Sequence, residues 1–220
     1  MADPRGEALA RSRSGPPPRE RSLSSVPADG VHRRVLDALV RSVAPADEAE
    51  RADVVEALDW IGRGAPLWRV GHPGDPAGPS PHLVTYTAVV DPDLQAVHLV
   101  ENRRASKWLV PGGHVRPGEH PEDAAGRKLG QELGLRAPLL AGLSSNPLFV
   151  TLADIAARGR HRDVGLWYVF VASITSGIQW DAHHVLRTRW WTLAEARNAH
   201  PALIQPALVR FATKLEAELA

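Results

Sequence analysis

The chain has 220 residues, of which 44% are hydrophobic and 23% are charged, as is typical of one soluble globular domain. It contains no cysteine, which excludes disulfides and thiolate metal sites and fits a reducing cytoplasm. The net charge is +1 with acids and bases interspersed, so there is no clear nucleic-acid footprint, and no apolar run approaches the roughly 20 residues of a membrane span.

Residues 1–30 are rich in Pro, Gly, Ser and Arg and carry almost no large apolar side chains. Such a segment cannot bury enough surface to offset the entropy lost on ordering, so we predict a disordered tail, with a tethering role as the alternative. The segment also lacks the apolar core of a signal peptide, and we therefore expect a cytoplasmic protein with no membrane partner.

Residues 31–64 are predicted to form an N-terminal helical extension. Apolar residues recur at three- and four-residue spacing over 31–43, which indicates an amphipathic helix that Pro45 interrupts. A second helix is expected over 47–61, ended by the following glycines. The simplest interpretation is that both helices pack on the rest of the chain; a lid or a homodimer contact is the alternative.

The remainder, 65–220, mixes strands with helices. A strand-like segment at 67–70 precedes a loop rich in Pro and Gly at 71–81. Further strands are expected at 82–90, 96–100, 107–110, 145–151, 164–172 and 187–191. Helices are expected over 121–133, ended by Gly134, and over 201–219. The class is α/β, with a mixed β-sheet sandwiched between helices.

A glycine- and glutamate-bearing motif, GHVRPGEHPEDAAGRKLGQELGL, covers residues 113–135. It closely resembles the Nudix box, which reads Gly, five residues, Glu, seven residues, Arg-Glu-apolar-any-Glu-Glu-any-Gly-apolar. Seven residues stand at family positions: Gly113, Glu119, Arg127, Leu129, Glu132, Gly134 and Leu135. The wider run over about 65–215 is also similar to one Nudix domain, so the resemblance implies the Nudix fold for 65–220.

The resemblance implies pyrophosphate cleavage assisted by Mg²⁺ or Mn²⁺ held by glutamates at positions 128, 131 and 132. These positions are spaced i, i+3 and i, i+4, so they share one helical face. Three carboxylates on that face would form an oxygen cage for a hard cation, which would offset the negative charge of a diphosphate and position a water molecule.

This sequence breaks the cage, because the three positions read Lys128, Gln131 and Glu132. A protonated lysine has no acceptor atom, and glutamine offers an oxygen without charge. We therefore expect Glu132 as the remaining ligand, Gln131 as a weak neutral one, and only weak binding of Mg²⁺ or Mn²⁺. Lys128 would either hold a phosphate directly as a point charge or form a surface pair with Glu132.

Other box residues are expected to shape the site. Gly112 and Gly113 would let the backbone approach phosphate, with His114 beside them in the substrate-binding region. Arg127 would orient Glu119 through a bidentate hydrogen bond and so brace the loop against the helix.

Other residues could take the place of the lost carboxylates as metal ligands. In the family a further carboxylate often precedes the later Trp, but the matching position is His184, with Asp163 and Asp181 nearby in sequence. Four histidines are candidates for a softer metal such as Zn²⁺: His114, His161, His183 and His184. Their spacing matches no known closed site, so surface or hydrogen-bonding histidines are the favoured interpretation.

Three functions remain open. The first is a Nudix-type hydrolase that cleaves a diphosphate linkage in a nucleotide-like or other X-linked substrate, with weakened or altered metal dependence. The second is a Nudix fold repurposed for ligand binding or regulation, and the third is a non-hydrolytic biosynthetic reaction in the same pocket. In each case the expected partner is a phosphate-containing small molecule, bound near Trp68 or Trp180 if one of these side chains stacks on a flat group.

Overall fold

The computed structural model describes residues 28–69, 81–93, 95–142, 145–155 and 161–218. The tail predicted at 1–30 lies outside these residues apart from its last three, which begin the first helix. Val70 and all but the last residue of the loop predicted at 71–81 also lie outside them.

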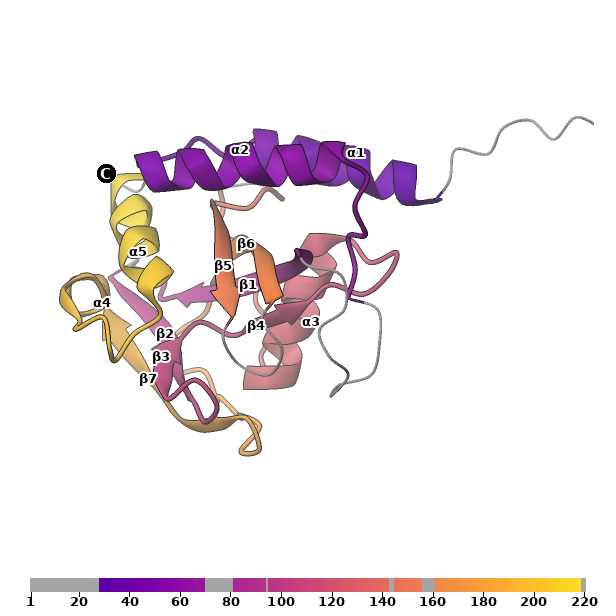
Figure 1. The fold of residues 1–220 in the computed structure, drawn as a ribbon. Helices are drawn as coiled ribbons and strands as arrows, with labels where there is room; N and C mark the ends of the chain where they lie inside the picture. The colour runs from indigo at the N-terminus through magenta and orange to yellow at the C-terminus, as the bar shows by residue number, and fades with distance from the viewer. Residues whose placement is uncertain (1–27, 70–80, 94, 143–144, 156–160, 219–220) are drawn as a thin grey trace, which may run out of the picture.

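Two N-terminal helices lie side by side along one edge of the molecule (Figure 1). They are α1 (Ala28–Arg41) and α2 (Glu48–Gly62). The side chain of Asp47 accepts a hydrogen bond from the backbone N–H of Glu50 and so caps α2 at its start. Both predicted helices are confirmed, and α2 packs on the strand β5 of the sheet.

In the part of the chain that the structure describes, the sheet has seven strands and is mixed. The strands are β1 (His82–Val90), β2 (Ala96–Asn102), β3 (Lys107–Leu109), β4 (Gly112–His114), β5 (Phe149–Ile155), β6 (His161–Val171) and β7 (Val185–Thr192). β1 pairs in parallel with β6, whereas the other strand pairs are antiparallel. On its other edge β1 pairs first with β4 and then with β2. The predicted mixed sheet is confirmed.

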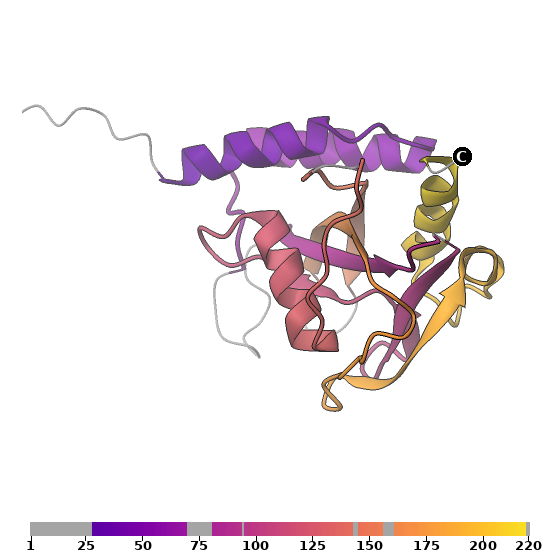
Figure 2. The ribbon, with the colours of Figure 1, turned by 180° about the vertical axis from the view of Figure 1, so that it is seen from behind.

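The box helix α3 (Pro121–Leu133) packs across β1, β4 and β6. It begins at a proline, whose missing N–H costs nothing in the first turn, and ends at Gly134 in the left-handed conformation with φ 64°. Its predicted bounds are confirmed. The α4 (Leu193–Asn198) and α5 (Pro206–Glu218) helices lie at the opposite end of the sheet, as Figures 1 and 2 show.

Two hydrophobic clusters hold these layers together. The first joins α1, α2 and α3 to the sheet, and the second joins α4 and α5 to it. Helices therefore cover the sheet from more than one side, and the predicted α/β sandwich is confirmed (Figure 2).

A buried ion pair ties the N-terminal helices to the C-terminal one. Lys214 Nζ lies 2.8 Å from Glu50 Oε1, and the two side chains are 2% and 0% exposed. Glu50 also accepts a hydrogen bond from the backbone N–H of Val150, and Lys214 donates one to the carbonyl of Ala44. Such a pair is stable only when its remaining polar atoms are also bonded, as they are here.

Some predicted elements were wrong. Residues 67–69 form no strand; Leu67 instead accepts one backbone hydrogen bond from Leu83. The helix predicted from 201 begins at Pro206, because 201–203 form a turn that leads to it. Strand β4 was not predicted, since two of its three residues are glycines, which weaken strands. The short α4 was also missed, although Thr192 and Glu195 form its capping box.

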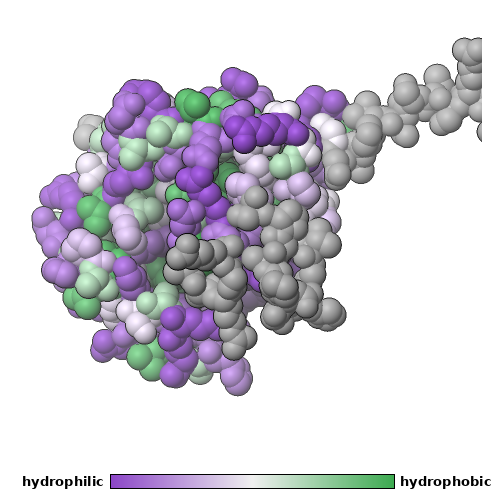
Figure 3. Space-filling view, in the orientation of Figure 1, coloured by the Kyte–Doolittle hydropathy of each residue, from purple (hydrophilic) through white to green (hydrophobic). Residues whose placement is uncertain are grey.

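On the face drawn in Figure 3, hydrophobic and hydrophilic residues are intermixed among those that are coloured. Within the described ranges, the exposed large apolar residues come from separate segments: Val31, Val55, Ile174, Trp180, Leu186 and Leu203. The helices that the structure describes include none with the length and apolarity needed to span a bilayer.

Candidate functional site

A cleft of about 620 Å³ opens where α3, β4 and the strands beside them meet. Its lining includes the three box positions Lys128, Gln131 and Glu132, together with Gly112 and Gly113. The volume lies in the range of pockets that hold nucleotide-sized ligands. The helical spacing of the box therefore does bring these positions to one concave surface.

Lys128 reaches this cleft by crossing Gly113. A Cβ atom at Gly113 would lie 2.6 Å from Cε and 2.7 Å from Nζ of Lys128, closer than atoms can approach without a shift. A Cβ at Gly112 would lie 2.5 Å from the carbonyl oxygen of Thr85. Close packing against the backbone of β1 thus requires a glycine at 112, whereas the flexible end of Lys128 could move away from a Cβ at 113. As the chain stands, Gly113 leaves the lysine ammonium directly over the backbone of β4.

Glu132 is the carboxyl group of the box that faces the cleft. Its Oε1 lies 3.9 Å from Lys128 Nζ, and its side chain is 20% exposed. Burial raises the pKa of Glu132, while the charge of Lys128 and a hydrogen bond from the backbone of Gly112 act in the opposite direction. A carboxylate with a raised pKa is a stronger base than an ordinary one.

Gln131 is exposed, and its amide oxygen accepts a hydrogen bond from Arg127 Nη1 at 3.2 Å. The oxygen that would serve as a neutral metal ligand is therefore engaged by a cation. This arrangement weakens the case for Gln131 as a ligand.

The structure brings Arg127 and Glu119 together. Arg127 Nε and Nη2 donate to the two oxygens of Glu119 at 2.6 and 2.7 Å. Arg127 Nη2 also donates to the carbonyl of His114, and Glu119 accepts from the backbone N–H of Arg116. The bond to Arg127 lowers the pKa of the Glu119 carboxyl group, as expected for a bidentate charged pair.

Asp181 and His184 line another part of the cleft. His184 Nδ1 lies 2.8 Å from Asp181 Oδ2, and the negative charge of Asp181 contributes to the raised pKa of Glu132. The position that is acidic in the family is therefore a histidine that pairs with a neighbouring acid. Trp180, beside this pair in the chain, is 43% exposed, whereas Trp68 contacts His32 edge to face.

We tested whether the box side chains fit the divalent cation of the family. Among the three positions Glu132 alone carries a negative charge, and a lysine ammonium lies 3.9 Å from it. Mg²⁺ and Mn²⁺ need several oxygen ligands, and their affinity depends on the charge of those ligands. The box residues therefore do not fit such a cation.

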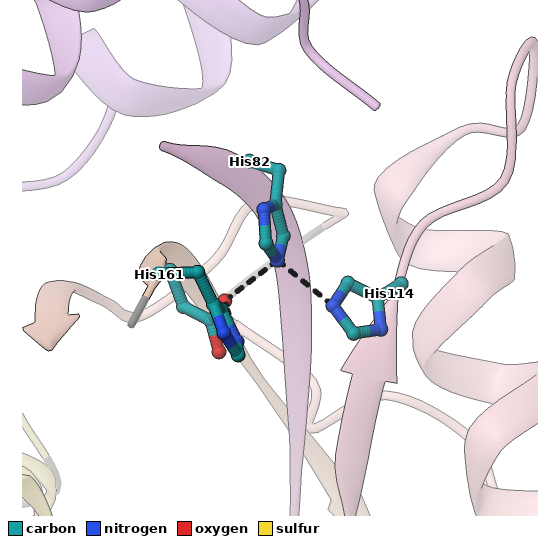
Figure 4. A group of neighbouring side chains, drawn as sticks. His82, His114 and His161 are labelled. Atoms are coloured by element: carbon teal, nitrogen blue, oxygen red, sulfur yellow. Dashed lines mark hydrogen bonds and ion pairs between the residues drawn. The ribbon is translucent and has the colours of Figure 1, made fainter. Parts of the chain in front are cut away.

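A second set of side chains converges on the strands beside the box. It consists of His82, His114, His161 and Asp163, and is called the histidine cluster below (Figure 4). His82 Nε2 lies 2.9 Å from His114 Nε2 and 3.0 Å from Asp163 Oδ1. His161 Nε2 lies 3.5 Å from the same Asp163 oxygen. One potential ligand atom from each residue lies within 4.8 Å of the others.

The strand registers explain this convergence. His82 is the direct partner of Asp163 in the parallel pair β1–β6. His161 precedes Asp163 by two residues, and His114 is the partner of Val84, which follows His82 by two. Side chains two apart on a strand point to the same face, so all four ligand-bearing side chains share one face of the sheet.

The structure brings together two of the four histidines that the sequence offered as candidates for a softer metal. His114 and His161 do come together, but His184 pairs with Asp181 instead, and neither it nor His183 is a member of the group. Sequence reasoning missed His82 as a partner. The signal that was available is the alternation His-x-Asp at 161–163 within one strand.

Burial lowers the pKa of His114 to about 4. Its imidazole is therefore neutral at pH 7 and keeps a lone pair on one ring nitrogen. His114 and Asp163 also line the cleft, so the histidine cluster and the box residues share one concave surface.

The sequence was compared with known families and proteins. The sequence profile described as the NUDIX domain matches residues 81–211. No curated protein matches the chain in sequence.

Solved structures of similar fold were also found. A C. elegans Ap4A hydrolase in a binary complex is 16% identical, with a TM-score of 0.50, over 62% of this chain and 96% of that one. The E. coli dihydroneopterin triphosphate pyrophosphohydrolase is 18% identical, with a TM-score of 0.50, over 63% of this chain and 96% of that one. A NUDIX-family hydrolase from Clostridium perfringens is 22% identical, with a TM-score of 0.49, over 63% and 97%.

Proposed function

The chain belongs to the Nudix family, and from this premise we propose that it hydrolyses a diphosphate linkage in a phosphate-containing small molecule. The substrate would carry a nucleotide-like or other X group. The observation that carries the proposal is the position of the Lys128 ammonium, which lies over Gly113 inside the cleft. An ammonium beside an open backbone can hold a phosphate group as a point charge.

Lys128 would take over part of the charge neutralisation that a divalent cation supplies in the family. The phosphate chain would lie along Gly112 and Gly113, with Lys128 against its oxygens and Arg104 at the rim of the same cleft. Dependence on Mg²⁺ or Mn²⁺ would accordingly be weakened or altered. Electrostatic stabilisation of the charge on the transferring phosphorus group accounts for most of the catalysis in reactions of this type.

Glu132 is the proposed general base. Water would attack one phosphorus atom, its proton would pass to the Glu132 carboxylate, and the bond from that phosphorus to the bridging oxygen would break. The electron pair of that bond leaves with the second phosphate. The raised pKa of Glu132 supports this role, because a stronger base accepts the proton more readily.

Two similar folds suggest the first substrates to test. Their names identify an Ap4A hydrolase and a dihydroneopterin triphosphate pyrophosphohydrolase, so both of those compounds belong in the panel beside nucleoside triphosphates and nucleotide sugars. The exposed Trp180, next to Asp181 of the cleft, offers a flat apolar surface for a base or another ring.

The second candidate is ligand binding without hydrolysis, which the poor fit of the box to a divalent cation favours. One experiment separates the two: product release from the panel is measured with Mg²⁺, with Mn²⁺ and with a chelator, beside thermal shifts for each compound. Hydrolysis that Glu132→Gln abolishes, and for which Lys128→Gln raises KM, supports the first function.

Lys107→Gln is the matched control, because Lys107 lies outside the cleft and donates to the carbonyl of Pro201. We expect its turnover to equal that of the unmodified chain. Stabilisation by a compound without product release supports the binding function. If no diphosphate compound stabilises the protein and none releases product, both functions are contradicted.

A further inference from the structure

The geometry points to a metal site of the zinc class at the histidine cluster, distinct from the box cage of the family. The site would be closed, with four protein ligands and a structural role joining β1, β4 and β6. It does not depend on the proposed hydrolysis, because neither Lys128 nor Glu132 contributes a ligand. The argument rests on the distances, the proton count and the donor chemistry of the cluster.

The distances suit a tetrahedral ion. With bonds of about 2.0–2.1 Å, the ligand atoms of a tetrahedral zinc site lie about 3.3 Å apart. In the cluster, the separations from His82 Nε2 to His114 Nε2 and to Asp163 Oδ1 are 2.9 and 3.0 Å. The separation from His161 Nε2 to Asp163 Oδ1 is 3.5 Å. All four ligand atoms lie within 4.8 Å of one another, so the more distant ones would have to move closer around the ion.

No placement of a hydrogen on His82 Nε2 gives that atom good hydrogen bonds to both of its close neighbours in the cluster. His82 Nε2 lies within 3.0 Å of both a carboxylate oxygen and another imidazole nitrogen. If His82 Nε2 carries a hydrogen, that hydrogen can be well directed at one of the two neighbours. If it carries none, its lone pair faces the acceptor oxygen of Asp163. A cation at the centre removes the conflict, because it accepts an electron pair from every member.

The ligands are held before any ion arrives. They project from three paired strands rather than from loops, and the His82 side chain is fully buried. The carbonyl of His114 accepts a hydrogen bond from Arg127 of the box. Ligands fixed in this way lose little freedom on binding, which favours tight binding.

The donors select the type of ion. Three imidazoles and one carboxylate suit Zn²⁺ and similar transition metals, whereas Mg²⁺ requires an oxygen-rich octahedral shell. The single carboxylate leaves the loaded site with a net charge of about +1, which lessens the cost of burying the ion.

The test uses the full chain without an added histidine tag, stripped of metal with a chelator and then titrated with Zn²⁺ alone. We expect one Zn²⁺ per chain and a higher melting temperature, with no comparable response to Mg²⁺. His161→Gln and Asp163→Asn should each weaken Zn²⁺ binding by at least about 100-fold, since even the loss of an outer partner costs about 10–100-fold. His184→Gln, which breaks a histidine–aspartate pair outside the cluster, should leave Zn²⁺ affinity unchanged.

Co²⁺ provides a second measurement that needs no variant. A four-coordinate site gives intense visible absorption, whereas a six-coordinate ion absorbs weakly, so the spectrum decides the question even if a cluster variant fails to fold. Intense absorption at one Co²⁺ per chain, competed away by Zn²⁺, supports the site. A weak six-coordinate spectrum, no bound ion, or unchanged affinity in both cluster variants overturns it. Loss of hydrolysis in Glu132→Gln with intact Zn²⁺ binding would leave this inference standing.

Discussion

The cleft has two parts that differ in what they offer a ligand. The part from α3 keeps the register of the Nudix box but presents an ammonium, an exposed amide engaged by Arg127, and one carboxyl group. The part from β1, β4 and β6 contributes no specified position of the box, because His114 stands where the box accepts any residue, yet it gathers three imidazoles and a carboxylate. The register of a motif therefore reports how the chain folds, whereas the side chains at its positions decide which ion can bind.

The largest effect is expected from restoring the family residues in the box. Lys128→Glu with Gln131→Glu replaces a cation and a neutral group by two anions on one helical face. The unmodified chain is expected to bind Mg²⁺ at roughly millimolar concentration or more weakly, and the double variant at least about 100-fold more tightly. Calorimetry measures both.

The control for this change is Lys107→Glu, which alters charge outside the cleft and should leave Mg²⁺ affinity as it was. Micromolar Mg²⁺ binding by the unmodified chain, without nucleotide, would show that the present box residues suffice. If the double variant gains no affinity, positions 128, 131 and 132 do not act together.

The next largest effect is expected at the Arg127–Glu119 pair, which joins the two parts of the cleft through the carbonyl of His114. Arg127→Ala should lower the free energy of unfolding by about 2 kcal/mol, between the values for exposed and buried pairs. The side chains are 19% and 16% exposed, which places them between these limits. Arg41→Ala, at a pair that is 62% and 38% exposed, should change the free energy of unfolding far less, because solvent screens an exposed ion pair. Equal losses in chemical denaturation would make the box pair an ordinary surface contact.

His98 is a buried histidine that does not belong to the histidine cluster. Burial lowers the pKa of His98 from its ordinary value of 6.5 to about 4. Above pH 6.5 this ring is neutral in the folded and unfolded chains; as pH falls from 6.5 towards 4, the unfolded chain takes up a proton that the folded chain does not. The stability that neutral His98 contributes is therefore lost over that window, by at most about 1.4 kcal/mol per pH unit.

His98→Gln should flatten this pH dependence, measured as the free energy of unfolding in a buffer series. The same variant should respond to Zn²⁺ like the unmodified chain, because burial alone does not make a histidine a ligand. A reduced Zn²⁺ response would mean that His98 influences the histidine cluster from β2.

The smallest change in the free energy of unfolding is expected for a substitution at Glu132. Because burial raises its pKa, the charged form is disfavoured in the folded chain above the ordinary carboxyl pKa, and this cost disappears at lower pH. Glu132→Gln should therefore raise the free energy of unfolding at pH 7 by less than about 1 kcal/mol, with a slightly higher melting temperature. Near pH 4 the variant should have no such effect. In Glu195→Gln the sign should be reversed, because a backbone hydrogen bond from Thr192 lowers the pKa of Glu195.

Local signals predicted the box helix well and the histidine cluster only in part. The proline at 121 and the glycine at 134 mark the ends of α3 within the sequence itself, so its register and its cleft-facing positions could be inferred. The approach of His82 to Asp163 depends on the parallel pairing of two strands about 80 residues apart, which no local pattern specifies. The glycine-rich β4 likewise forms because β1 offers it a partner, not because of strand propensity.

The buried pair between Glu50 and Lys214 affects when α2 can pack on the rest of the chain during synthesis. The two residues are separated by 164 positions, and each would be an uncompensated buried charge without the other. During synthesis at about 5–20 residues per second, α2 would emerge roughly 8–30 seconds before the lysine that completes its surroundings. Until then a charged Glu50 favours hydration over burial, which disfavours docking of α2 in its final position on the growing chain. Emergence of α5 from the ribosome would thus favour closure of the N-terminal helices over the sheet.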